Sequence, residues 1–173
     1  DIYNSVLLKD VIARNRIRDT ALLESIVLYL MDNIGNTFSA KTISDFLKSQ
    51  GRKLSTETVY NYLKALESAF LIHKVVRFDI KGKAYLRTLG KYYIVDIGLR
   101  NYLLGFRNRD SGHAIENVVY FELLRRGYDV AIGKIGSAEV DFIATTADDK
   151  KYIQVTESMM SEDVRNRELT PLQ

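Results

Sequence analysis

The 173-residue sequence contains no cysteine, so disulfide bonds and thiolate metal sites are excluded. This composition suits a reducing compartment, and we expect a cytoplasmic protein. Long hydrophobic runs are missing as well, because the densest run, Ser25–Met31, is far shorter than the roughly 18 residues that a membrane span needs. No apolar core follows a basic start, as it would in a signal peptide. The sequence therefore predicts a protein without a membrane partner.

Two further absences narrow the chemistry. No Ser/His/Asp or Cys/His set is recognisable, so nucleophilic hydrolysis has no support. The segment Gly35–Thr42 resembles a phosphate loop, but Ala40 replaces the second glycine of that pattern. A predicted helix also precedes the segment, where a phosphate loop needs a strand. We therefore expect no nucleotide at this segment.

Charge divides the chain into two parts. Residues 1–110 contain 18 Lys and Arg against 11 Asp and Glu, whereas residues 111–173 contain 7 against 11. A basic part beside an acidic part predicts two modules with different partners, and nucleic acid is the usual partner of a basic module. We place the boundary between residues 106 and 107. No Pro- or Ser-rich linker separates the modules, so we expect them to pack against each other.

The basic part has the element order of a winged helix. Apolar residues recur at helix spacing in three segments, residues 20–35, 39–51 and 55–71. Ser39 and Ser55 are suited to cap the second and third of these helices. β-branched and aromatic residues on both sides of residues 81–83 then predict a β-hairpin. With a joining strand at Tyr92–Val95 and a short helix after it, we predict a winged-helix domain over residues 1–106.

The polar side of the third predicted helix is a candidate DNA-binding surface. Removing the core positions leaves four residues on that side, Thr56, Tyr60, Asn61 and Lys64. In a helix-turn-helix the second helix enters the major groove, where Asn can pair with adenine and Lys with guanine or phosphate. Lys81, Lys83 and Arg87 of the hairpin are placed to touch a flanking backbone. The alternatives are a solvated helix face and a protein-interaction surface.

The acidic part begins with a predicted helix over residues 111–127. Its apolar side consists of five residues, with Glu116 beside them: Ile115, Val118, Val119, Leu123 and Leu124. Three strands follow at residues 128–135, 138–146 and 151–157. Ser161 is suited to cap a last helix, which ends at residue 169. Together the two parts predict the α+β fold class.

Three runs of the sequence resemble a known group of proteins. They are LIHKVVRFD with KGK and KYYIVDIGLRNYLLG, then IENVVYFELLRRGYDV, then EVDFIA with KYIQV. The combination resembles the C-terminal region of predicted prokaryotic AAA-type ATPases, in which a winged helix precedes a domain of the PD-(D/E)XK restriction-endonuclease-like fold. The resemblance implies that residues 107–173 form such a domain, incomplete at its C-terminus. It also implies an upstream ATPase module as partner, with ATP bound only there, and it leaves oligomer formation open.

The first residue is Asp1 rather than Met, so we expect a fragment of a longer protein.

The resemblance further implies a metal-dependent nuclease site. In this fold a helix acid, a strand Asp and a Glu- or Gln-x-Lys pair hold Mg²⁺, a hard cation that prefers oxygen ligands. The pattern assigns the helix acid to Glu116, the strand acid to Asp141 and the third ligand to Gln154. Thr156 stands at the catalytic position where the lysine is expected, and it cannot supply a positive charge.

The missing lysine leaves three interpretations open. Lys134, Lys150 or Lys151 could replace it, which would give an active Mg²⁺-dependent deoxyribonuclease. Without a replacement the domain would keep the fold with weak or no cleavage, and we expect this degenerate site within a nucleic-acid-binding module. In the third interpretation Glu116 and Asp141 only form salt bridges with nearby arginines, Arg125, Arg126 or Arg167. The alternative function is a non-catalytic protein-interaction or regulatory module of the ATPase.

Overall fold

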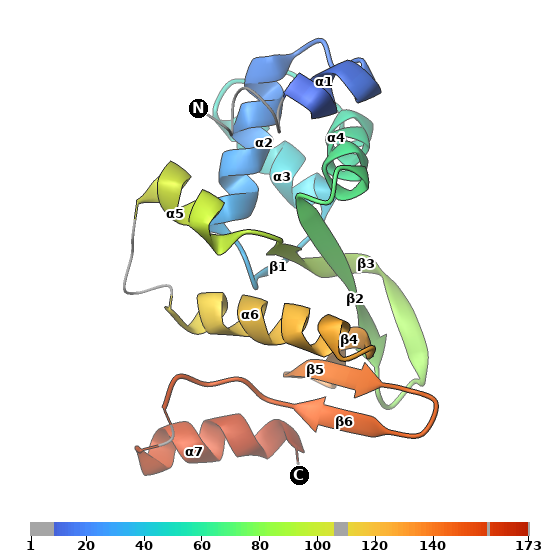
Figure 1. Cartoon of the computed structure of the whole chain (residues 1–173), viewed down its shortest axis with the longest axis vertical. Coiled ribbons are helices and arrows are strands. Elements are labelled where there is room, and N and C mark those ends of the chain that lie inside the picture. Colours follow the sequence, from blue (N-terminus) through green and yellow to red (C-terminus); the bar gives the residue numbers. More distant parts are fainter. Residues whose placement is uncertain (1–8, 106–110, 159, 173) are drawn as a thin grey trace.

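The structure is a computed structural model that describes residues 9–105, 111–158 and 160–172, with only the backbone of Arg87, Thr88 and Leu172. The helices are α1 (Lys9–Asn15), α2 (Thr20–Asp32), α3 (Ala40–Ser49), α4 (Thr56–Ser68), α5 (Ile97–Leu104), α6 (Ser111–Arg125) and α7 (Glu162–Leu169). The strands are β1 (Thr37–Phe38), β2 (Ile72–Asp79), β3 (Ala84–Ile94), β4 (Asp129–Ile135), β5 (Ala138–Thr145) and β6 (Lys150–Ile153) (Figure 1). No helix within the described residues is long and apolar enough to cross a bilayer.

The predicted helix caps are confirmed. The Ser39 hydroxyl accepts a hydrogen bond from the amide of Thr42 at 3.2 Å, and the Ser55 hydroxyl accepts one from the amide of Thr58 at 3.0 Å. Ser161 caps α7 in the same way. Each cap satisfies one of the amides that the first helical turn leaves without a partner. These short-range signals explain why the helices begin where the sequence predicts.

One six-stranded sheet joins the basic and the acidic parts. Its strand order is β1-β3-β2-β4-β5-β6, and every neighbouring pair is antiparallel except β2 and β4. The helices and the mixed sheet confirm the α+β fold class. The β2–β4 pairing crosses the predicted boundary at residues 106 and 107, so the two parts share a sheet. The division into two domains stays a prediction.

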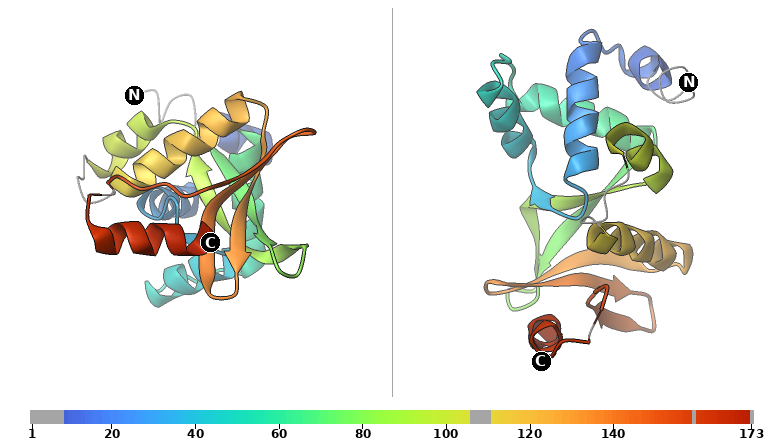
Figure 2. Two further views of the ribbon diagram at one scale, coloured as in Figure 1. Left: turned by 90° about the horizontal axis from the view of Figure 1, so that it is seen from below. Right: turned by 90° about the vertical axis from the view of Figure 1, so that its left-hand side faces the viewer.

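Two apolar clusters lie on opposite sides of β3. Tyr92 belongs to the cluster formed with the N-terminal helices, and its neighbour Tyr93 belongs to the cluster formed with α6. Successive residues of a strand point to opposite faces, so β3 separates the two clusters. The right-hand view of Figure 2 shows helices α1 to α5 on one side of strands β1 to β3, and α6 on the other. Strands β4 to β6 lie between α6 and α7.

The apolar side predicted for α6 is wrong in part. Ile115 is 37% exposed and Val118 is 59% exposed, whereas Glu116 and Asn117 are buried together with Tyr120 and Leu123. The Asn117 side chain accepts a hydrogen bond from the amide of Ile94 at 2.8 Å and donates one to its carbonyl at 2.9 Å. Polar pairing with β3 has therefore decided which side of α6 faces the sheet.

The last predicted strand is shorter than expected. It was predicted over residues 151–157, but β6 ends at Ile153. The amide of Val155 donates instead to the Asp141 carboxylate at 2.8 Å. This side-chain acceptor replaces a ladder partner, and the chain leaves the sheet beside Asp141.

The observed orientation of α6 can be tested with two neighbouring substitutions. Asn117→Leu would leave the amide and the carbonyl of Ile94 without partners in a buried place. We therefore expect it to lower the free energy of unfolding by about 2–6 kcal/mol, since each of the two unsatisfied groups costs about 1–3 kcal/mol. The control Val118→Ala should change it by less than about 0.5 kcal/mol, because Val118 is exposed. Urea unfolding measures both, and a larger loss for Val118→Ala would contradict this packing.

Candidate functional site

A buried lysine holds together the acids that the sequence singled out. Lys91 Nζ lies 2.9 Å from Glu116 Oε1, 2.8 Å from Glu139 Oε1 and 3.7 Å from Asp141 Oδ1. The lysine comes from β3, Glu116 from α6, and the other two acids from β5. We call these four side chains the Lys91 centre. The structure thus brings Glu116 and Asp141 to one cation, and the cation is a residue that sequence analysis missed.

An irregularity in β5 directs its two acids toward Lys91. Phe142 and Ala144 pack in the α6 cluster, and simple alternation would place Asp141 on the opposite face. Between the paired positions on either side of Asp141, however, β5 advances three residues, from Val140 to Ile143, while β4 advances only two. Such a bulge changes the direction of the side chains that follow it. Glu139, which precedes the bulge, therefore lies on the same face as Phe142 and Ala144 after it, and Asp141 lies within the bulge, so that both carboxylates reach Lys91.

Three other residues complete the surroundings of the centre. The Tyr93 hydroxyl donates a short hydrogen bond to Glu116 Oε1, and the Thr37 hydroxyl donates one to Glu139 Oε2 at 3.4 Å. Gly35 has a positive φ of 72°, and a Cβ there would lie 2.6 Å from His113 Nδ1 and 3.2 Å from Glu116 Oε2. A glycine is needed at this position because both the backbone conformation and the space exclude a side chain.

The pKa shifts follow from burial and from the shared ammonium. Burial alone would raise the pKa of Glu116, but His113, Lys91 and Tyr93 outweigh it and lower the pKa. His113 Nδ1 lies 3.9 Å away, beyond hydrogen-bond distance, so we attribute the lowering mainly to Lys91 and Tyr93. Burial raises the pKa of Asp141, and the neighbouring carboxylates add to this effect. The pKa of Lys91 is raised because Glu116 and Glu139 together outweigh its burial.

Gln154 and Thr156 both form hydrogen bonds within the protein. The Gln154 oxygen accepts a hydrogen bond from the amide of Asp141 at 3.3 Å, and its nitrogen donates to Glu168 Oε2 at 2.9 Å. Both ends of this amide are thus engaged, and its role as a metal ligand stays a prediction. The Thr156 hydroxyl donates to the carbonyl of Ser158 at 3.1 Å. Its catalytic role also stays a prediction.

The arginine partners proposed for the structural interpretation are wrong. Arg125 and Arg126 both pair with Glu122, and Arg167 pairs with Glu168. Glu116 and Asp141 pair with Lys91 instead.

The three lysines proposed to replace the missing catalytic lysine interact with residues outside the Lys91 centre or stand in the β4–β5 ladder. Lys151 pairs with Asp149 at 3.0 Å, and Lys150 Nζ lies over the rings of Phe78 and Tyr152. Lys134 stands opposite Glu139 in the β4–β5 ladder. A buried lysine needs paired acids, so Lys91 could have been suspected from its place just before the apolar run 92–95.

The described arrangement does not fit a metal ion. Carboxylate oxygens are suitable Mg²⁺ ligands, but the ammonium of Lys91 already lies among those of the centre. Within residues 9–105, 111–158 and 160–172, no three His, Cys, Asp or Glu side chains are placed to hold one metal ion. Three side chains of the centre are largely buried, with Lys91, Glu116 and Asp141 only 6%, 9% and 14% exposed, whereas Glu139 at its edge is 30% exposed.

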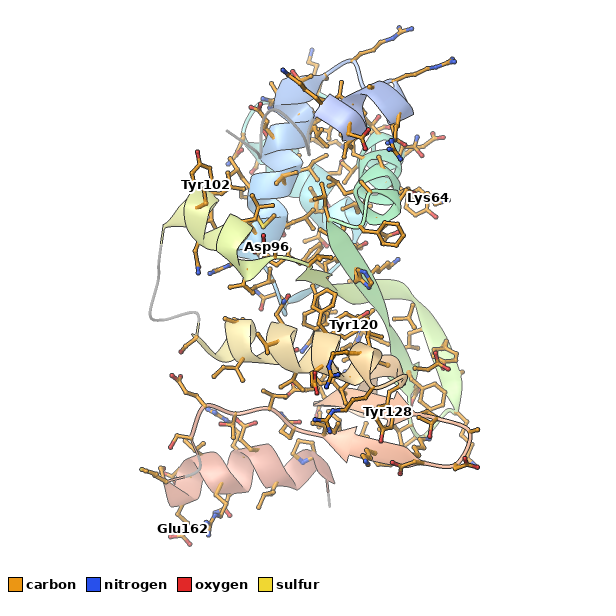
Figure 3. The ribbon with its side chains drawn as sticks, viewed as in Figure 1. Lys64, Asp96, Tyr102, Tyr120, Tyr128 and Glu162 are labelled. Atoms are coloured by element: carbon orange, nitrogen blue, oxygen red, sulfur yellow. The ribbon has the colours of Figure 1, made fainter. Side chains whose placement is uncertain are left out.

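The candidate nucleic-acid surface lies on α4. All four predicted residues are exposed: Thr56, Tyr60, Asn61 and Lys64. Lys64 Nζ lies 4.8 Å from the centre of the Tyr60 ring, a cation–π contact at the surface. Figure 3 shows Lys64 on the outer side of α4. The structure therefore places these side chains on one open helix face.

The hairpin tip is separate from this helix face. Lys81 and Lys83 are exposed in the turn between β2 and β3, while the side chain of Arg87 lies outside the described residues. The end of α4 leads into the first residue of β2, and the tip follows its last residue. At about 3.3 Å per residue, β2 alone spans roughly 23 Å. The two predicted groups of contacts therefore lie at opposite ends of β2.

The contribution of Glu116 to stability has a defined pH dependence. Its pKa in the folded protein lies below the ordinary value of 4.5, so its charge stabilises the fold above that pH and the stabilisation is lost as the pH falls through the folded pKa. We expect Glu116→Gln to lower the free energy of unfolding at pH 7 by about 1–3 kcal/mol. Urea unfolding of both proteins at pH 7 and pH 3.5 should show this deficit shrinking in acid. An equal deficit at both pH values would contradict the pairing.

Comparisons with known proteins identify a family without an assigned activity. Residues 1–110 match the family described as "Domain of unknown function (DUF8612)". An uncharacterized protein of Haemophilus influenzae is 44% identical over 154 residues, which cover 89% of this chain and 38% of that protein. An uncharacterized protein of Methanocaldococcus jannaschii is 31% identical over 159 residues, covering 90% of this chain and 35% of that protein. The chain thus spans little more than a third of the length of these relatives, and no solved structure matches it.

Proposed function

The chain belongs to the DUF8612 family, and we propose that it is a nucleic-acid-binding module whose Lys91 centre is a degenerate nuclease-like site. In this proposal α3 and α4 form the helix-turn-helix of a winged helix, and β2 with β3 forms the wing. The domain after it is of the PD-(D/E)XK-like type. An ATP-binding module elsewhere in the longer protein is the proposed partner within the same chain.

The open face of α4 carries the proposal of nucleic-acid binding. Its N-terminus is capped by Ser55, so the helix is formed from Thr56 onward, and the residues nearest this end would meet base edges. Asn61 offers a donor and an acceptor, and Lys64 offers a cation beside the Tyr60 ring. Lys81 and Lys83 would contact only a separate stretch of backbone, because the tip lies at the far end of β2.

Substitutions on α4 test this proposal directly. Duplex affinity, measured by fluorescence anisotropy at low salt, should fall about five- to tenfold for Lys64→Ala, which corresponds to roughly 1 kcal/mol. The slope of log affinity against log salt should decrease by about 1, as expected when one phosphate contact is lost. Tyr60→Ala should also weaken binding. Lys151→Ala is the matched control, because it removes the same charge from exposed β6. Equal losses for Lys64→Ala and Lys151→Ala would reject α4 as the binding surface.

The centre supports the degenerate form of the nuclease proposal. It contains the helix acid and the strand acid of the pattern together with a lysine, but the lysine comes from β3 and lies between the acids. Among the described residues, the ammonium of Lys91 and the burial of Glu116 and Asp141 leave no shared open face between these two acids for a scissile phosphate.

A cleavage assay separates the degenerate site from an active one. Plasmid incubated with Mg²⁺ or Mn²⁺ should stay intact or be nicked only weakly, and Asp141→Asn should behave in the same way. Efficient cleavage by the natural protein that disappears in Asp141→Asn would establish an active nuclease and reject the degenerate site. Cleavage that is equal in both proteins would come from a contaminant.

A second candidate function is a non-catalytic interaction module. The observation that favours it is the exposed apolar surface of α6 and its neighbourhood, where Val95, 48% exposed, lines a shared pocket with Val118, 59% exposed. Apolar side chains that cluster on a surface mark interaction sites. Absence of any duplex affinity at low salt would favour this candidate over the first.

A further inference from the structure

The Lys91 centre has an unusual charge balance for a buried site. Three carboxylates meet there, those of Glu116, Glu139 and Asp141. Lys91 supplies one positive charge, and Arg77 supplies a second, with its Nε 3.9 Å from Glu139 Oε2. Burying carboxylates is costly unless cations and hydrogen bonds compensate them. The two basic residues bring the centre within one charge of neutrality.

We infer that the Lys91 ammonium occupies the place of a divalent cation, so that the natural protein holds no metal ion at this centre. Nζ lies within 3.0 Å of carboxylates from two different elements, and within 4.0 Å of a third carboxylate. An ammonium with three donors satisfies such acceptors without bound water. Mg²⁺ usually keeps several waters, and the burial of Lys91, Glu116 and Asp141, which are 6–14% exposed, leaves little room for them on that side of the centre, although Glu139 is 30% exposed.

The surrounding hydrogen bonds support the same conclusion. Glu116 Oε1 accepts from Lys91 and from the Tyr93 hydroxyl, and Asp141 Oδ2 accepts from the amide of Val155. Gln154 uses both ends of its amide within the protein. The groups that a metal would need as ligands are therefore already satisfied by the chain. This inference concerns the same centre as the proposed function, but it does not depend on nucleic-acid binding by α4.

Removing the ammonium should create a metal site. Lys91→Met preserves the length of the side chain and removes the charge, which leaves two negative charges uncompensated beside Arg77. One divalent cation carries the opposite charge, and carboxylate oxygens are its preferred ligands. We therefore expect the variant to acquire an affinity that the natural protein lacks, and to depend on the metal for its stability.

The experiment compares Mn²⁺ binding and thermal unfolding in the natural protein and in four variants. The natural protein should show no stoichiometric Mn²⁺ binding by calorimetry and the same Tm in EDTA and in Mn²⁺. Lys91→Met should have a lower Tm in EDTA, bind Mn²⁺, and regain several degrees of Tm when it does. The double variant Lys91→Met/Asp141→Asn should lose the gained binding. Lys151→Met is the matched control, because its pairing with Asp149 is exposed, and it should gain none.

Two results would overturn the inference. The first is stoichiometric Mn²⁺ binding by the natural protein that Asp141→Asn abolishes, and this measurement needs no folded Lys91 variant. The second is a Lys91→Met protein that gains no Mn²⁺ affinity, or that fails to fold both in EDTA and in Mn²⁺. Folding in Mn²⁺ alone would support the inference. Duplex affinity should be the same in the natural protein and in Lys91→Met with Mn²⁺, so a failure here is distinct from a failure of the α4 proposal.

Discussion

The pairing of the Lys91 ammonium with three carboxylates is the constraint on which the arrangement of the sheet and α6 depends. A charge with a side chain only 6% exposed is tolerated in a protein interior when acids surround it closely. Those acids come from α6 and β5, which follow β3 by many residues. The pairing therefore fixes β3, α6 and β5 relative to one another. If the domain has the proposed nuclease-like fold, the same pairing occupies the place of its metal ion.

The orientation of α6 is a consequence of this constraint. If burial of apolar area alone decided the orientation, Ile115 and Val118 would face the sheet and Glu116 would face solvent. Glu116 is instead drawn to Lys91, and Asn117 satisfies both main-chain groups of Ile94. The helix thereby exposes apolar side chains at its outer surface. The burial of Glu116 and Asn117 against the sheet thus leaves Ile115 and Val118 on the solvent side of α6. For this reason both proposals, the nuclease-like centre and the interaction surface, involve the same helix.

Several features could be predicted from the sequence because they depend on near neighbours. The caps at Ser39, Ser55 and Ser161 follow from residues three positions apart, and the exposed face of α4 follows from helical periodicity. The irregularity in β5 could not be predicted, because it exists only in the register with β4. Lys91 was missed for a related reason: its three partners lie 25 to 50 positions further along the chain, in another charge region.

The sequence by itself determined the α+β class, the positions of most helices and strands, and the residues that could carry charge or contact nucleic acid. Periodicity and capping are local, so the chain encodes them within a few residues. Only the tertiary structure decided that Glu116 and Asp141 share a lysine, that Gln154 forms hydrogen bonds with Asp141 and Glu168, and that the hairpin tip lies far from the open face of α4. Each of these depends on the contact of distant segments, and electrostatic pairing acts through space without regard to sequence order.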